Sequence, residues 1–521
     1  MRVYTVHQPP NTKKAYHFCI LHYITKAMVF SQLSFLYLFL PVVMLLYFFA
    51  SDRARNVMIL VTGLLFYAWG EPFYVLVMLI STLIDYTAGR LMDRYDDRDD
   101  LRRVFLLVSV CMNVGLLAAF KYSDFIFDNI NALFGSDYTN PVLLLNKAIN
   151  RIAPFGLNER RVELPIGISF FTFQSMSYTI DLYRREIKVQ KSFVKFAGFV
   201  SLFPQIVAGP IVRYADVAKE LDHRTVSTAG VSQGFERFAK GLAKKVLLAN
   251  SIGTVWAQIK ATPFEELSAV SAWAGILAFT FQIYYDFSGY SDMAVGLGRM
   301  LGFTFPENFD HPDVSTSVTQ FWRRWHMTLG GWFRSYVYIP LGGNRCSTGR
   351  NIFNLLVVWG LTGLWHGASW NFVLWGLYFG VLLIMEKYVL KDILPKIPAF
   401  VRRVVTFLLV VMGWVLFDTE SLGAAGSFFR AMFGANGLIS EDTGYLLRTS
   451  AFIFLICILL CGTLHTRLIT SVRGFVSRKV SPKRMIIART AAVTVLEAAA
   501  VILCTSYIIG SSYNPFLYFR F

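Results

Sequence analysis

His366 stands in a long apolar stretch, GLTGLWHGASWNFVLWG at residues 360–376, as its only titratable side chain. An ionisable group inside a membrane-length apolar segment is unfavourable, and such groups commonly serve a function. Glycines on both sides of His366 allow a helix or a substrate to approach, and Trp365 provides an aromatic wall. We therefore expect His366 to be a functional residue. The alternative is a core histidine that is hydrogen-bonded between helices.

A second histidine, His326, lies in the segment FWRRWHMTLGGWFRSYVYIPLGGNR at residues 321–345. Trp322 and His326 are four residues apart and would share one face of a helix. An interfacial amphipathic helix would explain the tryptophans and arginines equally well, but it would not explain His326. The glycine-rich turn before Arg345 is compatible with a phosphate contact through backbone N–H groups. From this segment we take these as candidate supporting residues: Arg323, Arg324, Trp325 and Arg345.

Two carboxylates, Asp286 and Asp292, lie in a third segment, FQIYYDFSGYSDMAVGLG at residues 281–298. Carboxylates in such a setting orient a histidine or pair with a cation. The competing interpretation is that they cap a kinked helix.

Together, these segments favour proton abstraction in a secluded cavity. The ordinary pKa of histidine is about 6.5, so a neutral imidazole accepts a hydroxyl proton at neutral pH. The sequence contains no His/Cys cluster of the metal-binding kind, so we expect no metal. The simplest scheme is direct acyl transfer, in which His366 deprotonates an acceptor hydroxyl that attacks an ester or thioester.

The composition identifies the elements that must position these residues as membrane helices. Hydrophobic residues make up 55% of the 521 residues and charged residues 16%, where soluble domains carry about 25% charged residues. The formal net charge of +17 is explained by basic cytoplasmic loops, and the scattering of these residues argues against nucleic acid. We predict an all-α polytopic bundle with about eleven spans, near 33–50, 56–70, 72–92, 104–120, 242–258, 268–285, 352–368, 370–390, 403–417, 450–468 and 486–510.

Two apolar segments in the middle of the chain differ in composition from the predicted spans. The apolar segments 164–185 and 196–214 are interrupted by Pro, Gly, Gln and Ser. Non-helical backbone at membrane depth requires surrounding protein or a water-filled cavity. These segments therefore predict broken or re-entrant helices, with proline-kinked helices as the alternative. We expect residues 1–27 to be a disordered or misassigned extension, with translation starting at Met28, and residues 28–521 to form a single membrane domain.

Seven motifs also carry a family resemblance. The segments LPIGISFFTFQSMSYTIDLYRR, LFPQIVAGPIVRY, YDFSGYSDMAVGLGRMLGF, FWRRWH, YIPLGGNR, GLWHGASWNF and NPFLYFRF occur in this order between Met28 and Phe521. The chain thereby resembles the alginate O-acetylase branch of the membrane-bound O-acyltransferase superfamily.

The resemblance implies a helix bundle around a central funnel, with His366 as the superfamily histidine and His326 as the second histidine of the active region. It implies acetyl-CoA as the acyl donor on the cytoplasmic side of the cell (plasma or inner) membrane and an exported polysaccharide such as alginate as the acceptor. It also implies an extracytoplasmic hydrolase-like partner that completes the transfer. A polyanionic coenzyme cannot cross hydrocarbon, whereas an acyl group can be relayed.

Two positions depart from the pattern of the branch. Ser335 stands where an aspartate is expected, and Asp418 stands where an arginine is expected. D-alanyl transfer to teichoic acid is the second interpretation. A transporter or flippase is a third, although the two related halves common in transporters are missing from the sequence.

Overall fold

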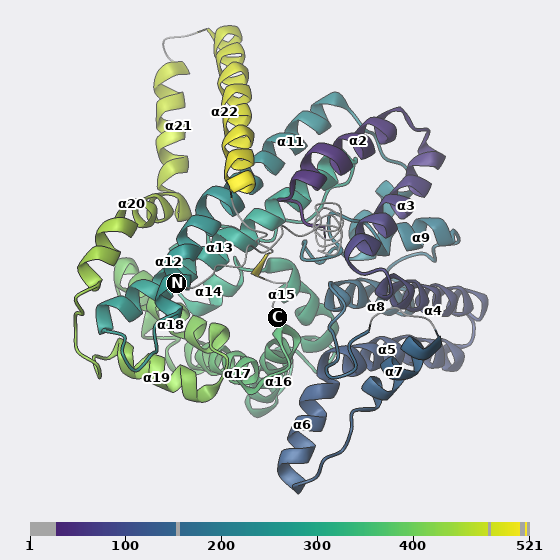
Figure 1. The fold of residues 1–521 in the computed structure, drawn as a ribbon. Coiled ribbons are helices and arrows are strands. Elements are labelled where there is room, and N and C mark those ends of the chain that lie inside the picture. Colours follow the sequence, from purple (N-terminus) through teal and green to yellow (C-terminus); the bar gives the residue numbers. More distant parts are fainter. Residues whose placement is uncertain (1–27, 153–156, 478–480, 511–515, 518–521) are drawn as a thin grey trace, which may run out of the picture.

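In the computed structural model, residues 28–152, 157–477, 481–510 and 516–517 are described, and every regular element in these ranges is a helix. This confirms the predicted all-α class (Figure 1). The predicted extension at residues 1–27 lies outside the described residues, and the single membrane domain stays a prediction.

The N-terminal half contains the α-helices that flank the site on one side. They are α2 (Leu40–Phe49), α3 (Asp52–Gly70), α4 (Tyr74–Arg94), α5 (Asp99–Leu117), α6 (Ser123–Phe134), α7 (Pro141–Ile152), α8 (Ile168–Tyr183), α9 (Phe193–Val200), α10 (Tyr214–Asp222) and α11 (Thr228–Ala243). A π-helical segment, η2 (Ala118–Tyr122), joins α5 to α6.

The C-terminal half contains α16 (Thr348–His366), which carries His366, and the two short helices on either side of His326. The α-helices of this half are α12 (Asn250–Lys260), α13 (Ala269–Met300), α14 (Val318–Trp322), α15 (Met327–Phe333), α16, α17 (Trp370–Ile384), α18 (Ala399–Asp418), α19 (Leu422–Met432), α20 (Thr443–Cys461), α21 (Leu464–Ser477) and α22 (Pro482–Gly510). The π-helical segments η3 (Lys244–Ala249) and η5 (Arg334–Tyr338) follow α11 and α15.

Among the described residues, six helices are long and apolar enough to span a bilayer: Tyr74–Arg94, Asp99–Phe134, Trp370–Val389, Ala399–Asp418, Thr443–Cys461 and Arg484–Gly510. The other predicted spans also fall on helices. Several of these are shorter or covered by protein, as α13 is, with most of its side chains buried. The chain is thus a polytopic helical membrane protein.

The two interrupted segments behave differently. Residues 164–185 do not form a broken helix, because α8 runs unbroken and only Pro165 and Gly167 precede it. Its hydroxyl groups bond to backbone oxygens of the same helix, for example Thr172 Oγ1 to the Ile168 carbonyl at 2.6 Å, so they leave the helix intact. In the second segment, α9 ends at Val200 and the chain continues to Arg213 without a regular helix. This irregular stretch is buried in protein from Ser201 to Val212, as such backbone requires at membrane depth.

The buried apolar residues form two clusters, and the histidines lie where these clusters meet. One cluster joins α2–α5 and α8–α11 with Leu329, Trp332 and Trp365. The other joins α12 and the first part of α13 with Trp325, Trp375 and Phe417. In Figure 1, α2–α5, α8 and α9 lie on the right, α12 and α18–α20 lie on the left, and α13 and α15 lie between them.

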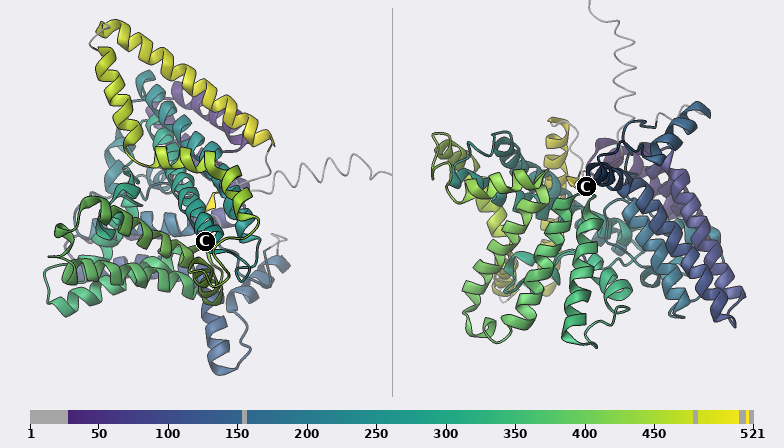
Figure 2. Two further views of the ribbon diagram at one scale, coloured as in Figure 1. Left: turned by 90° about the vertical axis from the view of Figure 1, so that its left-hand side faces the viewer. Right: turned by 90° about the horizontal axis from the view of Figure 1, so that it is seen from below.

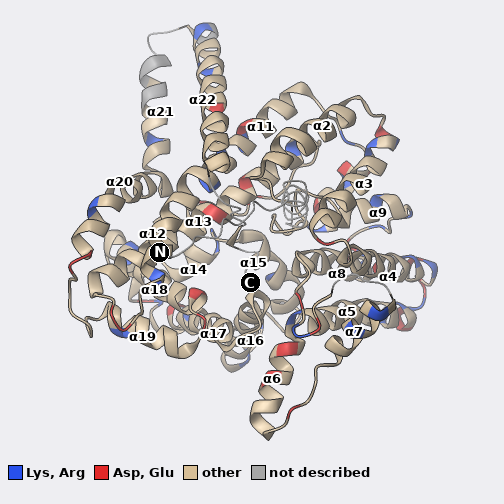
Figure 3. Ribbon diagram, viewed as in Figure 1, with Lys and Arg blue, Asp and Glu red and all other residues tan. Residues whose placement is uncertain are grey.

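The periphery consists of elements that project from this double core. The pair α21 and α22 extends from one side and α6 from another (Figure 2). Lys, Arg, Asp and Glu gather mostly at helix ends and around the outer edge (Figure 3). Some charged side chains are nevertheless buried, among them Lys245, Asp286 and Asp292.

Candidate active site

His366 is the last residue of α16, and its side chain is only 5% exposed. Helix α16 packs against α17 with backbone touching backbone. A Cβ atom on Gly363 would lie 2.2 Å from the carbonyl oxygen of Phe372, and one on Gly376 would lie 2.1 Å from that of Trp359. The glycine before His366 thus provides the close helix approach that the sequence indicated, and it brings the imidazole into the aromatic surroundings of α17.

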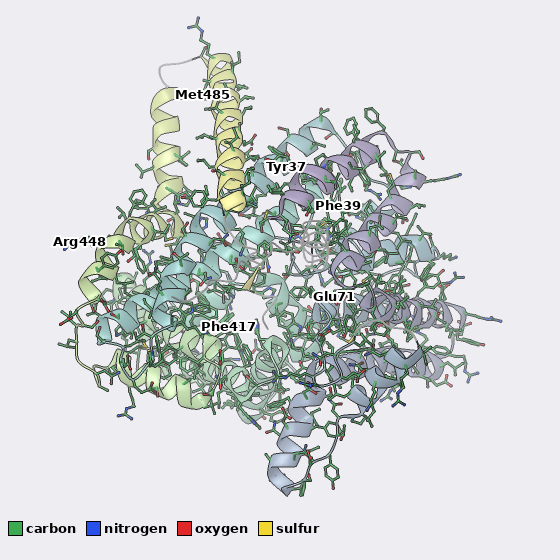
Figure 4. The ribbon with its side chains drawn as sticks, viewed as in Figure 1. Tyr37, Phe39, Glu71, Phe417, Arg448 and Met485 are labelled. Atoms are coloured by element: carbon green, nitrogen blue, oxygen red, sulfur yellow. The ribbon has the colours of Figure 1, made fainter. Side chains whose placement is uncertain are left out.

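Three aromatic rings enclose the imidazole of His366. Its ring centroid lies 4.9 Å from that of Trp375, 5.0 Å from that of Trp365 and 5.3 Å from that of Phe417. Phe417, labelled in Figure 4, lies toward the middle of the molecule, whereas Arg448 and Met485 lie at its periphery. The imidazole is therefore largely screened from bulk water.

His326 occupies a strained backbone position between two short helices. It precedes α15 with φ = 45°, in the left-handed region, where histidine is one of the few residues found several-fold more often than other side chains. Because α14 ends at Trp322, the expectation that Trp322 and His326 share one helix face is wrong. The His326 side chain is 2% exposed, and its ring packs edge-on against Phe287 at 4.7 Å.

Asn308 determines which nitrogen of His326 carries the proton. Its Oδ1 lies 3.1 Å from His326 Nδ1 and accepts from Thr328 N–H at 3.2 Å and Thr328 Oγ1 at 2.9 Å, while its Nδ2 donates to Ser291 Oγ at 3.0 Å. An amide oxygen fixed in this way only accepts hydrogen bonds, so Nδ1 of the neutral ring is the donor. The lone pair then lies on Nε2, which is the nitrogen able to accept a proton.

The two histidines flank a single indole. The Trp365 ring centroid lies 5.8 Å from the His326 ring and 5.0 Å from the His366 ring. Phe287 and Phe417, which contact the two histidines, also line one small cavity together with Asp286. The structure therefore brings His326, His366 and Trp365 together, whereas the predicted funnel stays a prediction. Two neutral bases in a water-poor enclosure suit proton transfer to and from a reacting hydroxyl.

The carboxylates of α13 are paired with cations. Asp286 receives hydrogen bonds from Lys245 Nζ and, at 2.8 Å, from the backbone N–H of Leu517. Asp292 forms ion pairs with Arg237 at 2.6 Å and Lys244 at 2.7 Å. Helix α13 is continuous through both residues, so the capping of a kinked helix is not what these carboxylates do. Asp286 adjoins the site through the neighbouring Phe287, and Asp292 ties α13 to α11 and η3.

The other predicted residues lie outside the immediate site. Trp325 is buried in the second cluster, with its ring 5.1 Å from that of Trp414. Arg323 is exposed. Arg324 Nη1 donates to the backbone carbonyl oxygen of Asp310 at 3.3 Å. Arg345 is exposed before the first turn of α16, about 28 Å from His366 at 1.5 Å per residue. It therefore does not contact the histidines.

Two residues that the sequence analysis missed hold the end of α16. Lys121 Nζ donates to the carbonyl oxygens of Trp365 and His366, and Tyr122 Oη donates to that of Leu364 at 2.9 Å. A signal was present, because Lys121 directly follows the apolar run at 104–120 and a lysine at membrane depth calls for explanation. Its partner more than 240 residues away is not visible in a sequence.

The two departures from the family pattern have local explanations. The carbonyl oxygen of Ser335 accepts from Arg184 at 3.1 Å, and the neighbouring Tyr336 hydroxyl donates to Asp181 of α8 at 2.8 Å, so α8 supplies a carboxylate here. Asp418 Oδ2 accepts from Lys260 Nζ and from Trp256 Nε1, both at 2.8 Å. Among the described residues, no three His, Cys, Asp or Glu side chains converge as metal ligands.

Comparison with known proteins identifies what this arrangement is similar to. Residues 57–417 match the family described as MBOAT, membrane-bound O-acyltransferase family. The chain is 39% identical over 406 residues to the protein named "Probable alginate O-acetylase AlgI" of Pseudomonas aeruginosa, covering 78% of this chain and 75% of that protein. It is 30% identical over 446 residues to the peptidoglycan O-acetyltransferase of Helicobacter pylori, covering 79% and 81%. It is 27% identical over 273 residues to the teichoic acid D-alanyltransferase of Bacillus subtilis, covering 49% and 68%.

Proposed function

Because the chain belongs to the membrane-bound O-acyltransferase family, we propose that it moves an acetyl group from a thioester donor toward hydroxyl groups of an exported polysaccharide. The observation that carries this proposal is the pair of buried histidines on either side of Trp365. The names of the Pseudomonas aeruginosa and Helicobacter pylori relatives refer to O-acetylation and to the glycan polymers alginate and peptidoglycan. That agreement supports a glycan acceptor.

The proposed reaction needs one base and one enclosed path. The His366 imidazole takes the proton of an acceptor hydroxyl as the oxygen attacks the thioester carbonyl carbon. The C–S bond then breaks, and the proton passes from the imidazolium to the departing sulfur, so that a free thiol and a new ester result. His326, with its Nε2 lone pair fixed by Asn308, assists as the second proton acceptor of the enclosure. Acetyl-CoA is the donor that we propose.

The charge distribution supports an orientation in the membrane. The start of α16 carries Arg345 and Arg350, and Lys387 bonds to Asn351 there at 2.7 Å. Basic helix ends face the cytoplasm. We therefore place the start of α16 in the cytoplasm and His366 toward the outer half of the cell (plasma or inner) membrane. A cytoplasmic coenzyme and an exported polymer then approach the histidines from opposite sides.

A partner protein completes the proposed transfer. The imidazole of His366 is 5% exposed and surrounded by three aromatic rings, so it offers little surface to a polysaccharide chain. A small hydroxyl-bearing carrier therefore accepts the acyl group first. We propose that an extracytoplasmic hydrolase-like partner then delivers it to the polymer.

The identity values rank the alternative of D-alanyl transfer lower. The chain matches the D-alanyltransferase at 27% identity over 49% of its length, against 39% over 78% for the AlgI protein. A transporter is excluded as the primary function because the chain belongs to an acyltransferase family.

Mass analysis of the surface polysaccharide tests the proposal directly. Cells that produce the protein, cells without it, and cells with His366→Ala are compared for ester-linked acetyl groups on the isolated glycan. We expect the acetyl groups to be lost in both mutant strains, with a His366→Ala rate reduced about 10²–10⁴-fold. Normal acetylation by a correctly inserted His366→Ala protein would refute the role of this residue, and D-alanyl esters in place of acetyl esters would establish the alternative.

A further inference from the structure

The ammonium group of Lys121 forms hydrogen bonds to three oxygen atoms near the C-terminal end of α16. It donates to the carbonyl oxygens of Trp365 and His366 and to Ser169 Oγ of α8 at 3.4 Å. The neighbouring Tyr122 hydroxyl donates a hydrogen bond to the carbonyl oxygen of Leu364. The last three carbonyls of α16 thus have donors from outside the helix, all supplied by one turn of η2.

Helix ends need such donors, and this one receives a cation. The last four carbonyls of a helix lack intrahelical partners and carry partial negative charge. An ammonium group satisfies both needs at once, because it has three donors and a positive charge. The oxygens around Lys121 belong to backbone and hydroxyl groups, and no ion pair among the described residues neutralises it. A lysine held in this way orients the backbone that it contacts.

The same segment also contacts the start of α17. Trp370, the first residue of α17, donates from Nε1 to Asn129 Oδ1 of α6 at 2.9 Å, and its ring packs on Phe125 at 5.6 Å. Residues 121–129 therefore form contacts at both ends of the short connection between α16 and α17, which follows His366. This fixes where α16 stops and where its terminal imidazole points.

We propose that Lys121 is a positioning residue of the acyltransferase site: through the carbonyls of Trp365 and His366 it holds the His366 imidazole in the orientation that proton transfer requires. The inference rests on the proposed function of His366. It assigns to Lys121 no contact with substrate and no proton in the reaction.

The test compares four variants in membrane vesicles supplied with radiolabelled acetyl-CoA and prepared from cells that make the polysaccharide. Lys121→Met removes the charge and the donors at similar length, and Lys121→Arg restores both. Lys387→Met is the matched control, because Lys387 Nζ binds Asn351 at the other end of the same helix at 2.7 Å. His366→Ala tests the underlying function in the same vesicles.

We expect Lys121→Met to lower kcat about 10–10²-fold, the effect of a misplacement near 1 Å, with an unchanged KM for acetyl-CoA. Lys121→Arg should recover most of the loss, and Lys387→Met should behave as the unsubstituted protein. A merely structural lysine would give parallel losses of folded protein and activity without a separate change in kcat. A folded Lys121→Met protein with normal kcat overturns the inference even if His366→Ala is inactive, whereas an active His366→Ala overturns the proposed function itself.

If Lys121→Met does not insert or fold, Lys121→Gln and Tyr122→Phe take its place. Each keeps part of these contacts, since Gln retains an N–H donor and Tyr122→Phe loses only the bond to Leu364. We expect each to lower kcat less than tenfold without a change in KM. Normal kcat in both folded proteins would overturn the inference in the same way.

Discussion

Replacing Asn308 with aspartate should inactivate the site at mildly acidic pH while leaving its shape intact. The side chain is fully buried and is held by His326, Thr328 and Ser291. Aspartate has the same size and keeps an oxygen within reach of both His326 Nδ1 and Thr328. The Nδ2 donor to Ser291 is lost, and the Ser291 hydroxyl has to donate to the new oxygen instead. The main change is the charge beside the imidazole, because a carboxylate there stabilises the doubly protonated ring and converts Nε2 from an acceptor into a donor.

The size of the effect follows from the distance. Nδ1 and Oδ1 are 3.1 Å apart, which puts the centres of the two charges about 4 Å apart. At an effective dielectric constant of about 20, opposite charges at that separation attract by about 4 kcal/mol. Since about 1.4 kcal/mol corresponds to a factor of ten, the ratio of neutral to protonated ring falls about 10³-fold. Burial lowers the pKa of His326 to about 3, so the carboxylate would raise it to about 6. The rate of Asn308→Asp should therefore fall about tenfold for each pH unit below 6, whereas the unsubstituted protein keeps its rate there.

Initial rates of acetyl transfer in membrane vesicles measure this loss, and detergent-solubilised size-exclusion profiles verify folding. Asn344→Asp provides a matched control, because Asn344 accepts from Lys387 at 2.7 Å in an exposed loop away from the histidines. We expect this control to keep full activity. A correctly folded Asn308→Asp protein with the same pH profile as the unsubstituted protein between pH 4 and 7 would show that an unprotonated His326 Nε2 is not required.

Two further predictions concern stability. Gly376→Ala should destabilise the α16–α17 pair by about 1–3 kcal/mol, because its Cβ would lie 2.1 Å from the Trp359 carbonyl oxygen. A lower thermal midpoint than that of Gly360→Ala, a position on α16 where an added Cβ would approach nothing closer than Leu377 Cδ2 at 4.0 Å, measures this, and equal midpoints would contradict it. Burial raises the pKa of Glu71, in the connection between α3 and α4, to about 7. Between about pH 4.5 and 7 the folded protein therefore binds more protons at this residue than the unfolded chain does. The free energy of unfolding falls as the pH rises through this range. Glu71→Gln should therefore raise the thermal midpoint at pH 8 and have little effect at pH 4.5, and a pH-independent difference would count against the shift.

The sequence carried enough information to place the two histidines in one site. His366 was recognisable because a single ionisable residue interrupts an apolar run, and that argument needs no knowledge of distant contacts. The glycines beside it indicated a close helix approach, which Gly363 provides against Phe372. Family motifs supplied His326, whose left-handed backbone no periodicity argument would have given.

Other parts of the site were hidden because they depend on contacts between distant segments. Arg345 resembled a phosphate ligand from its glycine-rich turn, yet α16 places it at the opposite end of the helix from His366. The prolines and glycines near residue 165 resembled a helix break, but they only precede α8. In each case the local signal was real, and its position relative to the rest of the fold decided its meaning.

The residues that sequence reasoning missed share one property: they orient a histidine without resembling a catalyst. Asn308 is an amide of ordinary local context and Lys121 is a lysine at the end of an apolar run, and each acts on a histidine through a hydrogen bond that only the fold creates. An imidazole placed among aromatic rings is not yet a catalyst, since proton transfer requires the correct tautomer and direction. If both positions prove as sensitive as the histidines, the catalytic unit of this enzyme consists of two histidines and the two residues that orient them, and a search for it by titratable residues alone misses Asn308.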